Sequence, residues 1–143
     1  MGLLTLGLAL AASVGCSGGL KCVPVTGSVK VGEKAPEGVL VTLVPSGGKD
    51  DPTARPTGIV NADGTFALST YDAANRAAVK GAPPGTYKVI FTWYPLHRPG
   101  EPSDPSAKPS VDKLGGRYAD PERSTFEVTI KDEPTELGVI RLK

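Results

Sequence analysis

The stretch Thr86-Tyr87-Lys88-Val89-Ile90-Phe91-Thr92-Trp93-Tyr94 has the pattern of one β-strand and is the most aromatic part of the chain. Successive side chains of a strand point to opposite faces of its sheet. One face therefore carries Tyr87, Val89, Phe91 and Trp93, and the other carries Lys88, Ile90, Thr92 and Tyr94. Burial stabilises each large aliphatic or phenyl side chain by about 1.5–3 kcal/mol. The pattern predicts a core strand with Trp93 facing inward.

Shorter strand patterns lie on both sides of this stretch. Residues 25–31 and 126–130 alternate between apolar and polar side chains, and 137–142 complete the set. Val39 to Val44 is a nearly continuous β-branched and apolar run, which predicts a central strand. Residues 57–61 and 65–71 flank Asn61-Ala62-Asp63-Gly64, a turn in which Gly64 can adopt the positive φ of a tight hairpin. Residues 72–80 predict a loop with one helical turn.

Glycine and proline are abundant, at 18 and 14 of 143 residues, and both interrupt helices while suiting turns. Six prolines and a Gly-Gly pair fall in residues 95–124, which predicts a long connection without strands. The whole pattern predicts an all-β fold, an antiparallel sandwich of about seven strands. We expect one domain over residues 25–143 with a Pro-rich insertion at about 95–124.

The first residues of the chain have the features of a targeting signal. The apolar run from Leu3 to Ala12 is too short to span a bilayer core of about 30 Å, but it fits the central region of an export signal. Ser13-Val14-Gly15-Cys16 resembles the lipobox of bacterial lipoproteins. That resemblance implies a signal peptide over 1–15, a lipid on Cys16, a tether over 16–24 and anchorage at the cell envelope. An ordinary signal peptide and a retained N-terminal anchor remain alternatives.

Motifs within the domain carry a second resemblance. Thr26-Gly27-Ser28-Val29-Lys30-Val31, Gly38-Val39-Leu40-Val41-Thr42-Leu43, Asn61-Ala62-Asp63-Gly64-Thr65-Phe66-Ala67-Leu68 and Pro84-Gly85-Thr86-Tyr87-Lys88-Val89 resemble the carboxypeptidase regulatory-like domain. The resemblance implies a seven-stranded prealbumin-like, or transthyretin-like, sandwich, and it implies no peptidase activity. With the lipobox and Leu114-Gly115-Gly116-Arg117-Tyr118-Ala119-Asp120-Pro121, the chain resembles small lipoproteins of planctomycete bacteria.

Catalytic and cofactor motifs are sparse. His97 is the single histidine, and no Gly-x-Ser-x-Gly element accompanies it, so we expect no enzymatic activity and no cofactor. Asp50, Asp51 and Asp63 lie in turn-like sequence without the spacing of a calcium loop, so we expect no metal site. The net charge of +1 provides no sustained field for nucleic acid. Cys22 is interpreted as an inert thiol in the tether.

Two functions from different classes remain. The first is a structural or protein-interaction module of the cell envelope, held to the membrane by its lipid and binding through strand edges or the Pro-rich connection. The second is a carbohydrate-binding module that stacks a polysaccharide on Trp93, Tyr94 or Tyr118. Arg117 and Tyr118 are a further candidate binding pair. The alternative for this pair is docking, with Leu114 and Tyr118 packed on the sandwich and Arg117 paired with an acidic group.

Overall fold

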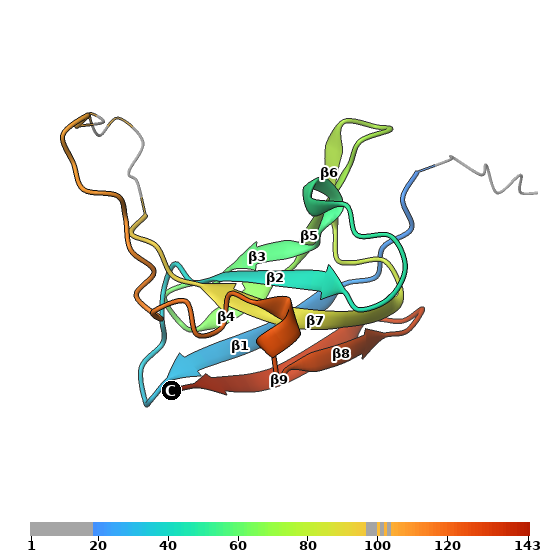
Figure 1. The fold of residues 1–143 in the computed structure, drawn as a ribbon. Helices are drawn as coiled ribbons and strands as arrows, with labels where there is room; N and C mark the ends of the chain where they lie inside the picture. The colour runs from blue at the N-terminus through green and yellow to red at the C-terminus, as the bar shows by residue number, and fades with distance from the viewer. Residues whose placement is uncertain (1–18, 97–99, 101, 103) are drawn as a thin grey trace, which may run out of the picture.

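Two packed β-sheets form the fold in the computed structural model, which describes residues 19–96, 100, 102 and 104–143 (Figure 1). The predicted signal peptide, Cys16 and His97 lie outside the described residues. Within the described part of the chain, the larger sheet has the order β6-β5-β3-β2-β7-β8 and is antiparallel throughout. Its strands are β2 (Leu40–Pro45), β3 (Thr57–Ile59), β5 (Ser69–Asp72), β6 (Ala77–Lys80), β7 (Gly85–Thr92) and β8 (Glu127–Ile130). The prediction of an all-β sandwich is confirmed.

The smaller sheet has the order β4-β1-β9, with β1 (Val25–Val31), β4 (Thr65–Ala67) and β9 (Thr135–Leu142). Here β1 and β9 are parallel, with Val25 opposite Thr135 and Val31 opposite Leu142. The prediction of a purely antiparallel fold is therefore wrong. The turn after β8 carries the chain out of the larger sheet, and β9 then runs beside β1 in the same direction. Alternation of side chains fixes which face is buried but not the direction of a distant partner strand.

The predicted number of strands is also wrong, because the described residues contain nine strands instead of about seven. Residues 65–71 split at Leu68 into β4, which pairs with β1, and β5, which joins the larger sheet. The predicted turn is present, with Gly64 at φ 86° and its N–H donating to the Asn61 carbonyl. The strands on its two sides, β3 and β4, however, belong to different sheets.

The second additional strand is β6, which replaces the predicted helical turn in residues 72–80. Asp72 ends β5 and accepts hydrogen bonds from the backbone N–H groups of Ala74 and Asn75. Arg76 then takes a positive φ of 51°, and the chain reverses into β6. The Asp72 carboxylate accepts these backbone N–H groups, which in a helix would donate to backbone carbonyls of the preceding turn. Residues 72–77 therefore form the turn of a hairpin and not a helical turn.

The core lies between the inner faces of the two sheets. Val41, Leu43, Val89 and Phe91 come from the larger sheet, and Val25, Val29, Phe66, Ile140 and Leu142 from the smaller one. The Phe91 side chain is fully buried, and its ring makes edge-to-face contacts with Phe126 at 5.6 Å and Tyr118 at 6.4 Å between centroids. Trp93 is half-buried and packs against this core from the end of the same stretch. The predicted inner face of residues 86–94 is confirmed.

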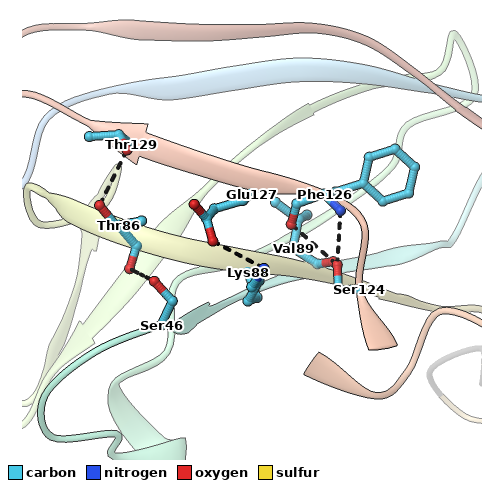
Figure 2. Close-up of polar contacts among 8 residues, drawn as sticks. All are labelled: Ser46, Thr86, Lys88, Val89, Ser124, Phe126, Glu127 and Thr129. Atoms are coloured by element: carbon cyan, nitrogen blue, oxygen red, sulfur yellow. Dashed lines mark hydrogen bonds and ion pairs between the residues drawn. The ribbon is translucent and has the colours of Figure 1, made fainter. Parts of the chain in front are cut away.

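Polar contacts hold β8 onto the edge of the larger sheet (Figure 2). The Thr86 and Thr129 hydroxyls lie 3.2 Å apart across the strand pair, and Lys88 forms an ion pair with Glu127 at 3.0 Å. The Ser124 hydroxyl donates to the Val89 carbonyl at 2.6 Å and accepts the Phe126 N–H at 3.2 Å. Ser124 follows a 3-10 turn at Pro121–Arg123, so its hydroxyl joins the end of the long connection to β7.

The sandwich has two distinct ends (Figure 1). At one end lie the N-terminal segment 19–24, the turn between β5 and β6 and the turn between β8 and β9. At the opposite end, the chain leaves β7 and enters a projection that we call the arm, described at residues 93–96 and 104–113. The described part of the long connection contains no strand, as predicted.

Truncation of Phe91 tests the role of this ring in the core. Phe91→Ala should lower the free energy of unfolding by about 3–5 kcal/mol, because it opens a cavity between both sheets and the connection. Val139→Ala is the control, since 55% of the Val139 side chain is exposed, and it should cost much less. Urea denaturation measures both. Equal losses would contradict the position of Phe91 at the centre of the core.

Candidate functional site

Exposed apolar side chains gather where the arm leaves the sandwich. Leu40 and Ile59 are cross-strand partners on the outer face of the larger sheet, and they are 37% and 54% exposed. Leu96 is 57% exposed, and its side chain lies against the backbone of Gly38, two residues before Leu40. Tyr94 follows β7 and is 48% exposed. We call Leu40, Ile59, Tyr94 and Leu96 the arm-base patch.

A hollow of about 330 Å³ adjoins this patch and is lined by Glu37, Trp93, Tyr94, Leu96 and Lys113. The Trp93 indole N–H donates to the Glu37 carbonyl at 3.1 Å, and the Lys113 ammonium lies 4.8 Å from the centre of its ring. Because Trp93 also packs against the core, its ring is engaged from several sides. The Tyr94 ring is therefore the more accessible of the two aromatic side chains that line the hollow.

Arg117 and Tyr118 lie together on the connection, away from the hollow's lining. Arg117 donates to the backbone oxygens of Leu114 at 3.1 Å and Lys143 at 2.6 Å. The Tyr118 hydroxyl accepts the Lys143 N–H at 2.8 Å, and its ring packs against Phe91 and Phe126. Leu114 is buried, so the docked arrangement is present. The partners of Arg117 are these oxygens of Leu114 and Lys143 and not the side chain of an aspartate or glutamate.

Asp112 anchors the arm, and the sequence reasoning missed it. Its carboxylate accepts the backbone N–H groups of Trp93 at 2.8 Å, Leu114 at 2.9 Å and Gly116 at 3.1 Å. The side chain is only 8% exposed. Locally, the sequence shows only an aspartate two residues before a possible N–H donor, which is a common pattern in turns. The contact with Trp93 joins the two ends of the arm, so no local pattern reveals it.

At the other end, the chain before β1 is docked onto the sandwich. The backbone N–H of Leu20 donates to Asp72 at 3.1 Å, Lys21 pairs with Asp132 at 2.8 Å, and Val23 exchanges backbone hydrogen bonds with Ala82. The expected tether over 16–24 is described from Gly19 onward, and this part contacts the sandwich. Its donors find acceptors on β5 and on neighbouring segments, which the sequence did not predict.

The N–H of Leu20, together with the Asn75 amide and the N–H groups of Asn75 and Ala74, lowers the pKa of Asp72. Nearby, Cys22 is a half-buried free thiol. Burial raises the pKa of Cys22, while a hydrogen bond with Thr70 opposes that effect. A protonated, half-buried thiol is a poor nucleophile, which fits the interpretation of Cys22 as inert.

The aspartates weighed as calcium ligands each serve a local turn. Hydrogen bonds from Arg55 lower the pKa of Asp50, and the Thr53 hydroxyl and N–H lower that of Asp51. Thr65 acts in the same way on Asp63. Among the described residues, no group of three or more His, Cys, Asp or Glu side chains could hold a metal ion. The same part of the chain contains no helix long and apolar enough to cross a membrane.

Neither a protein-family model nor a curated protein matches this chain.

Removal of the Asp112 carboxylate tests its role as the anchor of the arm. Asp112→Ala leaves three backbone donors without their acceptor, and each unsatisfied buried group costs about 1–3 kcal/mol. The free energy of unfolding in urea should fall by at least one such increment. Asp104→Ala is the matched control, because the Asp104 carboxylate accepts hydrogen bonds from Ser106 in an exposed turn. Similar losses for the two variants would refute the anchoring role.

The depressed pKa of Asp72 fixes the direction of a pH effect. Asp72 stabilises docking of the N-terminal segment above about pH 3.9, the pKa of an unperturbed aspartate, and this contribution is lost as the pH falls through the lower folded value. In an NMR titration, the Leu20 amide proton should therefore shift with a midpoint below about pH 3.9. Asp72→Asn should abolish the transition. A midpoint at or above the unperturbed value would show that Leu20 does not bind this carboxylate.

Proposed function

We propose that this protein is a cell-envelope lipoprotein, anchored through a lipid on Cys16, whose domain is a non-catalytic protein-interaction module. The sequence supports the anchor through the apolar leader and Ser13-Val14-Gly15-Cys16. The proposed domain family is the carboxypeptidase regulatory-like type with a prealbumin-like sandwich. Its support is the set of turn and strand motifs given above, together with the two-sheet architecture.

The observation that carries the interaction role is the arm-base patch. Four large apolar side chains are exposed at one end of the sandwich, next to a hollow that Lys113 and Glu37 border with charge. Contiguous apolar surface rimmed by polar groups is typical of protein-binding sites. The arm is held in place by Asp112, so the patch is preorganised for a partner, which reduces the entropy lost on binding.

Carbohydrate binding by the same end is the second candidate. Tyr94 offers an accessible ring beside the charged groups of the hollow, and sugars bind to such combinations of aromatic and polar groups. The Trp93 ring is the larger platform, but Lys113 lies over it and its N–H is bonded to Glu37. Leu40, Ile59 and Leu96 bring no hydrogen-bonding groups. These features favour a protein partner over a polysaccharide.

Site-specific photo-crosslinking in native cells tests the interaction role. A photoreactive amino acid in place of Leu96 should give a discrete protein adduct, whereas the same group in place of Val139 should not. The two positions are 57% and 55% exposed, so the comparison is matched. Tyr94→Ser should remove the Leu96 adduct. Equal adducts from both positions would contradict the proposed protein-binding site. If instead the isolated domain retains a polysaccharide and the Tyr94→Ser variant does not, the carbohydrate-binding function is favoured.

The anchor and the lack of catalysis have their own controls. Fatty-acid labelling of the chain should disappear in Cys16→Ser, and equal labelling would remove the lipid from the proposal. The domain should show no turnover on a broad panel of hydrolase substrates. Turnover that His97→Ala abolishes would overturn the non-catalytic role.

A further inference from the structure

The short chain segment before β1 limits where the domain can lie relative to its anchor. Docking fixes Leu20 at Asp72 and Lys21 at Asp132, both at the end of the sandwich opposite the arm (Figure 1). Leu20 lies four residue steps after Cys16, and an extended chain covers at most about 3.6 Å per step, or roughly 14 Å in total. The docked end therefore stays within that distance of Cys16.

The arm lies beyond this reach. β9 starts next to the docked end, where Thr135 donates its N–H to the Pro24 carbonyl, and runs toward the end that carries the arm. Its 8 residues span about 26 Å at 3.3 Å per residue. A lipid on Cys16 therefore holds the docked end close to the membrane, whereas the leash between Cys16 and Leu20 sets no such limit on the distance between the membrane and the arm-base patch.

The hairpin of β5 and β6 has side chains suited to a lipid surface. Tyr71 is 46% exposed and pairs across the hairpin with the exposed Ala78. Arg76 and Lys80 are also exposed, at the turn and at the end of β6. Tyrosine rings favour the level of lipid headgroups, and long basic side chains reach phosphates while their stems cover apolar surface.

We propose that the β5–β6 hairpin lies against the lipid headgroups of the membrane that holds Cys16, with the arm-base patch directed away from that membrane. This inference rests on the proposed lipid anchor. Asp72 makes the arrangement rigid, because one carboxylate binds both the incoming segment through Leu20 and the hairpin turn through Ala74 and Asn75. The segment that leads from Cys16 and the hairpin that faces the membrane are thus joined through Asp72.

Tryptophan quenching on vesicles tests this orientation. Trp93 is the only tryptophan, so Trp93→Phe provides a dark background into which Ala78→Trp or Val111→Trp places one reporter. The lipidated full chain is bound to phosphatidylcholine vesicles that contain a headgroup spin label as the quencher. Ala78→Trp should lose about half of its fluorescence, since the proposed orientation places the hairpin against the headgroups that carry the quencher. Val111→Trp, on the exposed arm, should be nearly unquenched.

Equal quenching of the two reporters, or stronger quenching of Val111→Trp, would overturn the orientation. A flexible insert of about 20 Gly and Ser residues between Gly18 and Gly19 should reduce quenching of Ala78→Trp, because the domain can then leave the surface. Unchanged quenching would show that the short leash does not set the orientation.

Flotation with the vesicles separates this inference from the anchor itself. If the chain made in cells does not float, the lipid anchor of the proposed function fails. A maleimide lipid can then be coupled to Cys16 of a Cys22→Ser chain lacking residues 1–15, and the two reporters compared again. Quenching confined to Ala78→Trp would still support the orientation that the docked segment imposes, and its absence would refute it.

Discussion

Two buried carboxylates at opposite ends of the sandwich bind two parts of the chain that lie outside the strands, the N-terminal segment and the arm. Asp72 binds Leu20 and the β5–β6 turn, and Asp112 binds Trp93, Leu114 and Gly116. Their side chains are 6% and 8% exposed, so backbone N–H groups take the place of water around each carboxylate. Without them, the N-terminal segment and the arm would each lose hydrogen bonds that tie them to the sheets, and the surfaces at both ends would be less well ordered.

This arrangement gives the two ends of the molecule different surfaces. The core around Phe91 fixes the two sheets and, through Tyr118 and Phe126, the return of the long connection. The Asp72 end carries the segment proposed to lead to the lipid, while the Asp112 end supports the exposed apolar side chains of the arm-base patch. In the proposed function, one end attaches and the other binds a partner. The β-sheets act as a rigid spacer between the two surfaces.

The sequence predicted the strands whose alternation is strong, including β1, β2 and β7, and it placed Phe91 correctly inside. It could not predict that β9 runs parallel to β1, because pairing between distant strands leaves no trace in local periodicity. β6 was missed because Ala77 and Ala78 resemble helix formers, and the capping by Asp72 decides the local fold. Residues 65–71 form two strands because the chain passes from the smaller sheet to the larger one at Leu68. The alternation of apolar side chains does not reveal such a crossing.

The candidate site was predicted only in part. Trp93 and Tyr94 follow from their place at the end of the aromatic stretch, but the exposure of Leu40 and Ile59 depends on the outer face of the larger sheet being uncovered there. The role of Asp112 depends on a contact with Trp93 across the arm. Arg117 binds backbone oxygens, which every residue offers, so no sequence pattern identifies its partners.

Residue-resolved amide hydrogen exchange on the domain tests the central claim that two carboxylates hold the two ends. The account predicts slow exchange for the N–H groups of Leu20, Trp93 and Leu114, although all three lie outside the strands. Exchange of these amides at the rate of an unfolded chain, with the strand amides still protected, would contradict it.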